Sequence, residues 1–222
     1  AVIIKDKRIL EYVYDEDKKL VLYETKHKII RINDDAAAEN FNKVVVPTRD
    51  INDFMALKAR AISPTGKITL LNRDNIKELD NIENMGGFKI FAIEGVEKGG
   101  EVEYFYTTKS DNADLYGRET EQNIFSVKTA SIDIITPKNL LFETKSYNGF
   151  PDLSATETDS IRTLSATLNN IPPILEETYA NYQSNLMYID YKVAYNKEYP
   201  FKKRLYDWDT ASENFSMLIY NY

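Results

Sequence analysis

Apolar and polar side chains alternate with a period of two along much of the chain. This pattern predicts β-strands, because successive residues of a strand point to opposite faces. Residues 9–14 and 20–32 show it on either side of a charged turn at 15–18, and they are predicted to form a long antiparallel pair. The second segment is longer than an average strand, so we expect it to bend or to carry a β-bulge.

Turn residues separate the remaining strand segments. Residues 63–66 have Pro second and Gly fourth, the signature of a type I turn, which predicts a hairpin of 55–62 with 68–71. Gly99 and Gly100 mark a similar turn between segments 88–96 and 101–109. Further strands are predicted at 44–46, 122–126, 131–136, 140–147, 160–166 and 187–195.

Helical patterns are short and few. Asp34 is a candidate N-cap before good helix formers, so a short helix ending near Phe41 is expected. Residues 72–87 are polar and are interpreted as a loop with at most one helical turn, at 76–79. Near the end of the chain, Thr210 and Glu213 form a capping box ahead of an apolar stripe at helical spacing, which predicts an amphipathic helix.

These elements together predict the fold class. Many short alternating segments separated by turn signals are typical of an all-β protein, here a large antiparallel β-sandwich with a short C-terminal helix. We assign residues 1–200 to the sandwich and 201–222 to a linker and helix. A chain of 222 residues can bury a sizeable core without disulfides or metals.

Composition excludes several functions. The formal net charge is −7, with 28 basic and 35 acidic residues interspersed, which argues against nucleic-acid binding. The absence of Cys removes thiol nucleophiles, Cys-ligated zinc and iron–sulfur clusters. No apolar run is long enough for a transmembrane segment. The chain opens at Ala1 without a signal-peptide pattern, and we interpret it as an excised or processed piece.

Candidate catalytic and metal-binding groups are weak. His27, the single His, lies between two lysines and cannot supply a zinc site or a triad alone, so it is interpreted as a strand residue. The acidic clusters at 15–17 and 176–177 are typical of solvated surface rather than of a glycosidase pair. Segment 111–117 lacks the ligand spacing of a calcium loop, with Gln122 at its twelfth position, and is interpreted as a loop between strands. We therefore predict no catalytic residue, cofactor or metal.

Tyrosine is abundant, with 16 in the chain. Its apolar ring and polar hydroxyl suit both sheet packing and a surface that contacts a peptide, a glycan or another domain. Both interpretations stay open for the seven that crowd the last quarter: Tyr179, Tyr182, Tyr188, Tyr191, Tyr195, Tyr199 and Tyr206.

Two segments carry a family resemblance. Residues 58–67 read KARAISPTGK and residues 91–104 read FAIEGVEKGGEVEY. They resemble two hairpins of a domain of unknown function, family 3857, which precedes transglutaminase-like domains in secreted bacterial proteins. The opening strand, residues 29–32, and residues 206–209 with the following helix are also similar. Departures at the turn and strand positions Thr65, Glu94 and Gly100 touch no known chemistry.

The resemblance implies an antiparallel β-sandwich with an accessory role in an exported, periplasmic or cell-envelope protein. It also implies that a Cys-His-Asp machinery lies downstream of Tyr222. The first hypothesis is therefore a non-catalytic module that supports or positions a transglutaminase- or protease-like domain of the same chain. The alternative is a peptide- or glycan-binding module with a Tyr-rich surface, and a carboxylate hydrolase is a distant third.

The C-terminal segment is the candidate docking surface for the downstream domain. Its apolar stripe needs a partner, and aromatic residues often anchor buried interfaces. The competing interpretation is that the helix packs back onto its own sandwich. The interface candidates are Tyr199, Phe201, Tyr206, Trp208, Phe215, Leu218 and Ile219, with Tyr222 continuing the stripe.

Overall fold

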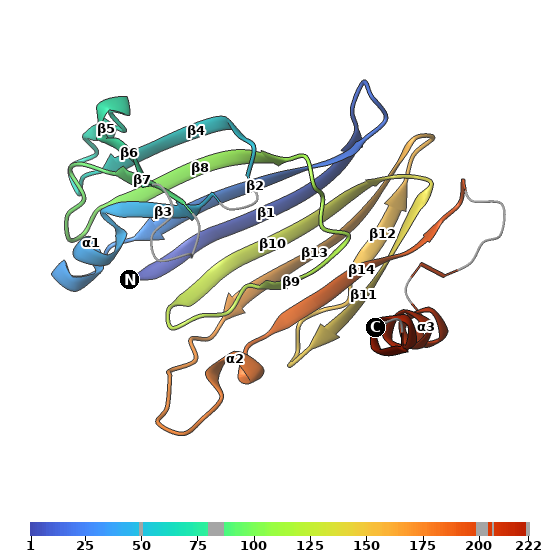
Figure 1. Ribbon diagram of the computed structural model, residues 1–222. Helices are drawn as coiled ribbons and strands as arrows, with labels where there is room; N and C mark the ends of the chain where they lie inside the picture. The colour runs from blue at the N-terminus through green and yellow to red at the C-terminus, as the bar shows by residue number, and fades with distance from the viewer. Residues whose placement is uncertain (49–50, 80–86, 199–203, 206, 221–222) are drawn as a thin grey trace.

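The computed structural model describes residues 1–48, 51–79, 87–198, 204–205 and 207–220 (Figure 1). Strands make up 54% of the chain and helices 13%, which confirms the all-β class and places helix content far below one-third. The strands form one eight-stranded sheet and two three-stranded sheets, and no sheet closes into a barrel.

The eight-stranded sheet is the first layer of the sandwich. Its strands pair in the order β12-β13-β10-β1-β2-β8-β4-β5. All its pairs are antiparallel except β1 with β10, which is parallel because the chain visits other strands before returning beside β1. The bounds are β1 Val2–Tyr14, β2 Leu20–Arg31, β4 Asp53–Ile62, β5 Ile68–Leu70, β8 Glu101–Ser110, β10 Ser126–Pro137, β12 Ser154–Glu157 and β13 Ile161–Ile171.

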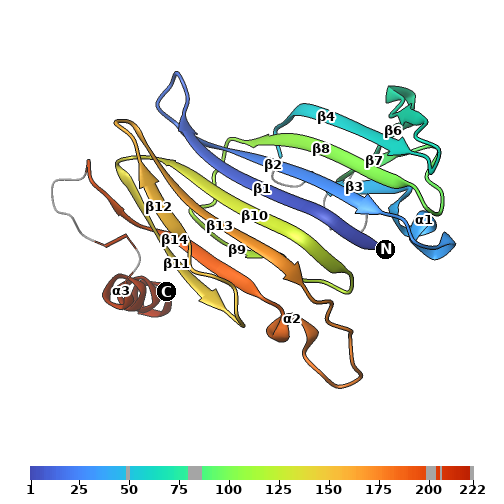
Figure 2. The same ribbon diagram turned by 180° about the vertical axis from the view of Figure 1, so that it is seen from behind.

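Two small sheets lie side by side as the second layer (Figures 1 and 2). One has the order β11-β14-β9 and the other β3-β7-β6. Their bounds are β11 Leu140–Tyr147, β14 Tyr188–Asn196, β9 Tyr116–Thr120, β3 Lys43–Pro47, β7 Phe88–Ala92 and β6 Ile76–Leu79.

Strand alternation puts both small sheets on the same face of the large sheet. In the antiparallel register, Tyr12 of β1 pairs with Leu22 of β2, which in turn pairs with Ser110 of β8, so even-numbered residues of these strands share one face. On that face the Tyr12 ring contacts Phe142 of β11 at 4.9 Å between centroids. Tyr106 of β8 meets Phe91 of β7 at 6.4 Å. The hydrophobic core therefore lies between the large sheet and the two small ones.

Several predicted strand details are wrong. Residues 76–79 form strand β6 rather than a helical turn, and residues 122–125 lie outside any strand. Strands β7 and β8 flank the predicted turn but do not pair, because β7 joins the second layer while Gly100 accepts a hydrogen bond from Ile32 N at 3.0 Å. The expected irregularity lies in β1 rather than in β2, between Ile3 and Lys5.

The turn at 63–66 confirms the sequence prediction. Gly66 N donates to Ser63 O at 2.9 Å, and Gly66 has φ +86°, a conformation that glycine adopts without strain. Strands β4 and β5 pair across this turn, as expected.

Helix α1, Asp35–Phe41, also follows the sequence prediction. Asp34 is its N-cap, and Asp34 Oδ1 accepts a hydrogen bond from Ala37 N at 2.7 Å. Asp34→Ala should lower the free energy of unfolding by about 1 kcal/mol, because one buried amide loses its acceptor. Urea denaturation would measure this. Asp35→Ala is the matched control, and an equal loss in both variants would contradict the capping role.

The remaining helices are short. A 3₁₀ turn, η1, spans Arg73–Asn75 before β6, and α2 spans Tyr182–Asn185 after β13. The final helix α3 spans Trp208–Tyr220, and its cap is Asp207 rather than the predicted Thr210, because Asp207 Oδ1 accepts from Thr210 N at 2.7 Å. No residue of α3 is buried, and it stands beside the β11–β14 side of the sandwich in both views. The described residues include no helix long and apolar enough to cross a membrane.

Candidate functional site

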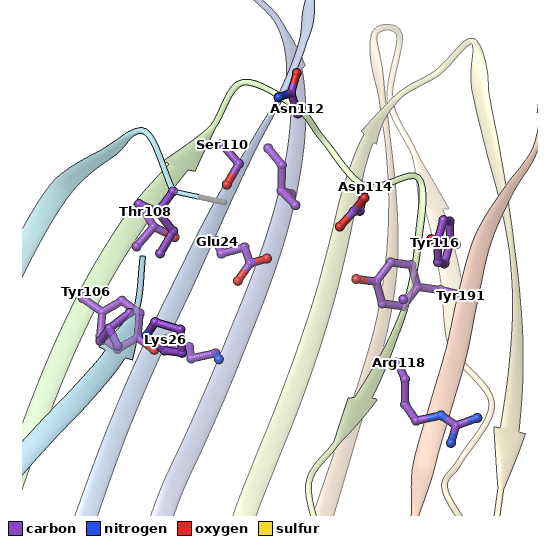
Figure 3. A pocket seen from close by; sticks show the side chains of 15 residues that line it. Glu24, Lys26, Tyr106, Thr108, Ser110, Asn112, Asp114, Tyr116, Arg118 and Tyr191 are labelled. Atoms are coloured by element: carbon purple, nitrogen blue, oxygen red, sulfur yellow. The ribbon is translucent and has the colours of Figure 1, made fainter. Parts of the chain in front are cut away.

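A cleft of about 350 Å³ lies where the two small sheets approach one another over the large sheet (Figure 3). We call it the central cleft. Residues of β2 and β8 form its floor, Val46 and Pro47 of β3 line one wall, and Tyr116 to Arg118 of β9 line the other. The sheet order makes β3 and β9 the edge strands of their sheets. The cleft therefore lies between two sheet edges.

The outer edge of β9 pairs with no strand among the described residues. Val193 N donates to Leu115 O at 2.7 Å, so by alternation Gly117 and Glu119 also direct their backbone groups toward β14. The backbone groups of Tyr116, Arg118 and Thr120 then point away from β14. Thr120 O fits this direction, because it accepts from Arg8 Nη2 at 3.2 Å.

The outer edge of β3 is arranged in the same way. Ile93 N donates to Asn42 O at 2.7 Å, and Thr48 N donates to Gly87 O at 2.8 Å. Even-numbered residues of β3 therefore face β7, and Val45 directs its N–H and C=O to the outer edge. Pro47 next to it offers no N–H, which limits pairing at that end.

Two opposite charges lie on the cleft floor. Glu24 and Lys26 alternate on β2 and share the inner face of the large sheet. Burial is the largest cause in both cases: it raises the pKa of Glu24 and lowers the pKa of Lys26. Within the part of the chain that the structure describes, neither side chain takes part in an ion pair. Both charged groups are therefore available to a ligand.

Tyr191 of β14 lines the cleft beside β9. Its ring is buried, and a Cβ added at Gly117 would lie 2.3 Å from the Tyr191 hydroxyl. Glycine at position 117 is therefore what lets that hydroxyl reach past β9. In Figure 3 the hydroxyl of Tyr191 and the carboxylate of Asp114 point toward the side of the cleft where Glu24 lies. The Asp114 segment is held in place because Tyr12 donates its hydroxyl to Asp114 O at 2.7 Å.

A buried ionic cluster borders the cleft beneath β9. Arg8 pairs with Glu119, and Arg8 Nε lies 3.4 Å from Glu121 Oε1. Beside them Lys28 Nζ lies 2.8 Å from Asp6 Oδ2. Burial disfavours the charged form of Arg8, but the surrounding carboxylates outweigh it and raise its pKa. This cluster joins β1 of the large sheet to β9.

Glu121 is the least favourable charge in the cluster. Its side chain is fully buried, and neither carboxylate oxygen has a hydrogen-bond partner among the described residues. Burial is the largest cause and raises the pKa of Glu121. Arg8 lowers this pKa, whereas Asp6 and Glu119 raise it, and the result is a pKa of about 8. We therefore expect Glu121 to be mainly protonated at neutral pH.

Aromatic and charged side chains gather on the outer surface of the β11-β14-β9 sheet, which we call the tyrosine face. Tyr147 and Tyr188 stack with their ring centroids 4.6 Å apart, and the Arg118 guanidinium lies 3.8 Å over the Tyr188 ring. Arg118 also forms a two-pronged ion pair with Asp190. A shallow hollow of about 1020 Å³ lies along this face, with Lys145 and Lys192 on its border.

Comparison with protein-family models identifies the family of the chain. A family model described as a domain of unknown function with a solved structure, DUF3857, matches residues 22–175. The chain belongs to the DUF3857 family. No curated protein matches it.

One similar solved structure is the crystal structure of a "putative protease" from Parabacteroides distasonis ATCC 8503. The TM-score is 0.73 at 16% sequence identity, and the match covers 99% of this chain. It covers 46% of the Parabacteroides chain, so the DUF3857 chain spans about half the length of that protein. At this identity the match shows the fold.

The predicted interface candidates fall into two groups. Trp208, Phe215, Leu218 and Ile219 lie exposed on α3. Tyr199, Phe201, Tyr206 and Tyr222 lie outside the described residues. None of the described candidates lines the central cleft.

His27, which the sequence predicts as a strand residue, has an acidic neighbour that lies on the adjacent strand rather than next to it in the sequence. His27 Nε2 lies 2.7 Å from Glu103 Oε1 across the β2–β8 pair, and Arg60 Nε donates to the same carboxylate at 2.6 Å. These bonds lower the pKa of Glu103, although burial works in the opposite direction. Among the described residues, no group of three or more His, Asp and Glu is placed to hold a metal ion.

Sequence reasoning missed the residues of the central cleft. Glu24 and Lys26 follow the alternation of β2, so their positions on one face were predictable. The sequence pattern does not predict which face of β2 is covered, because the covering strands come from distant segments of the chain. The sequence pattern predicts a loop at Gly117, whereas the structure places it in β9.

Proposed function

We propose that this DUF3857 domain is a non-catalytic accessory domain of a longer exported protein, in which it supports or positions a transglutaminase- or protease-like domain. The observation that carries the proposal is the exposed apolar face of α3. Phe215, Leu218 and Ile219 are 66%, 69% and 65% exposed and fall on one helical face. Apolar surface left in water costs about 25 cal/mol per Å², so such a face favours a partner.

The family and the fold support the same proposal. The Parabacteroides protein has the fold of this chain over about half its length, so in that protein the fold occurs together with a further region. The cleft and the tyrosine face offer binding groups. An accessory role uses surfaces of this kind rather than chemistry.

The test separates docking from self-packing. Phe215→Ser, Leu218→Ser and Ile219→Ser are combined in one variant, and Met217→Ser with Tyr220→Ser on the opposite face is the matched control. The stripe variant should keep the melting temperature of the sandwich and lose binding to the separately expressed downstream region, measured by calorimetry. The control should keep both. A drop in melting temperature of the stripe variant, or unchanged binding, would contradict the proposal.

The tyrosine face favours a second function, binding of an acidic glycan. Tyr147 and Tyr188 stack beside cationic groups, because Lys145 Nζ lies 5.3 Å over the Tyr147 ring, and neither Lys145 nor Lys192 forms an ion pair among the described residues. Tetragalacturonate should therefore bind more tightly than cellotetraose in a fluorescence titration, and Tyr147→Ala should weaken it. Equal binding of the two sugars, or none, would exclude this function.

A further inference from the structure

The second layer of the sandwich is interrupted at its centre. The first layer is one continuous sheet, whereas the second consists of two sheets whose edge strands β3 and β9 both border the central cleft. Open edges offer unpaired N–H and C=O groups, which an extended chain satisfies by adding a strand. The floor beneath the gap carries Glu24 and Lys26, which form no ion pair with any residue that the structure describes.

We propose that the central cleft binds an extended peptide segment of a partner protein, which pairs with the outer edge of β9 and places one basic and one acidic side chain over Glu24 and Lys26. This site is separate from the α3 surface and does not depend on the docking proposal.

The backbone of β9 fixes where such a peptide pairs. Tyr116 and Arg118 direct their N–H and C=O groups away from β14, toward the gap. Beyond them, Thr120 O is already occupied by Arg8. The free stretch therefore ends at the ionic cluster, and the peptide gains its backbone bonds at positions 116 and 118.

The charges on the floor match the repeat of a β-strand. Residues i and i+2 of a strand point to the same side and lie about 6.7 Å apart. Glu24 and Lys26 have this spacing on β2. A strand in the second layer that runs along β2 therefore directs two alternate side chains onto these two charges. Opposite charges at those positions are favoured, and like charges are excluded.

The size of the cleft also suits such a ligand. Its volume of about 350 Å³ is at the lower end of ligand pockets and holds a few side chains rather than a folded domain.

The experiment uses two blocked peptides, acetyl-Ser-Thr-Glu-Thr-Lys-Thr-Ser-amide and the same peptide with Glu and Lys exchanged. Strand direction in the cleft decides which order matches, so one should bind at least about tenfold more tightly in calorimetry. The double variant Glu24→Lys with Lys26→Glu keeps the net charge and should reverse the preference. Replacing the central Thr of the better peptide by Pro should abolish binding, because Pro removes a backbone donor.

The controls keep the result interpretable. If the double variant does not fold, the single variants Glu24→Gln and Lys26→Met should each reduce the preference between the two peptides. Equal affinity for both peptides, a preference that survives the charge exchange, or tolerance of the central Pro would each overturn the proposal. Binding of free glycine in competition with the peptides would identify a small-molecule site instead and would likewise overturn it.

Discussion

Arg8→Ala is expected to lower the free energy of unfolding by about 3–5 kcal/mol at pH 7. Arg8 is the cation paired with the carboxylate of Glu119, and both side chains are mostly buried between β1 and β9. Without the guanidinium, the Glu119 carboxylate stays in a poorly solvated site with no compensating charge. Urea denaturation at pH 7 measures the loss.

Arg31→Ala is the matched control for this prediction. Arg31 also pairs with a glutamate, but its partner Glu101 lies on the neighbouring strand β8 and the pair is on the exposed face of the large sheet. Exposed pairs contribute roughly 0–1 kcal/mol, so the control should change little. A loss for Arg8→Ala no larger than for Arg31→Ala would show that the buried cluster does not stabilise the junction of floor and β9.

Glu121→Gln is expected to stabilise the domain increasingly as pH rises. In the folded chain the pKa of Glu121 is raised to about 8 from 4.5, so between these values the folded state binds a proton that the unfolded state has released. The contribution of this group is therefore complete below pH 4.5 and is lost as pH rises through about 8. The shift corresponds to about 3–5 kcal/mol. Glutamine resembles the protonated carboxyl and removes that dependence.

The measurement is the free energy of unfolding of both proteins at pH 5 and pH 8.5. The difference between variant and wild type should be small at pH 5 and should reach several kcal/mol in favour of the variant at pH 8.5. Glu119→Gln is the control, because Glu119 is the direct partner of Arg8, and its loss should destabilise the domain. A difference for Glu121→Gln that does not change with pH would contradict the protonated state.

Local signals predicted the elements that depend on neighbouring residues. The Asp34 cap and the turn at 63–66 are confirmed, because each is built from hydrogen bonds within a few residues. The hairpin of β7 with β8 was wrong, since the turn at 97–100 leads from one layer into the other. Strand β6 was missed because its alternation is short and mostly exposed.

The candidate site depends on contacts that a linear pattern does not contain. Strand β9 looks polar on both faces, since its inward Glu119 is paired with Arg8, 111 residues earlier in the chain. Glu24 and Lys26 resemble an ordinary solvated strand face until β9 and β3 are placed over them. Alternation predicts which residues share a face, and only the tertiary arrangement shows that two free edges border that face.

Hydrogen exchange measured by NMR tests the open cleft most directly. In the free domain, the amides of Tyr116 and Arg118 should exchange rapidly, whereas those of Gly117 and Glu119, which face β14, should be protected. With the better of the two heptapeptides bound, the Arg118 amide should become protected as well. Protection of Tyr116 and Arg118 already in the free domain, or no change on peptide addition, would contradict the account.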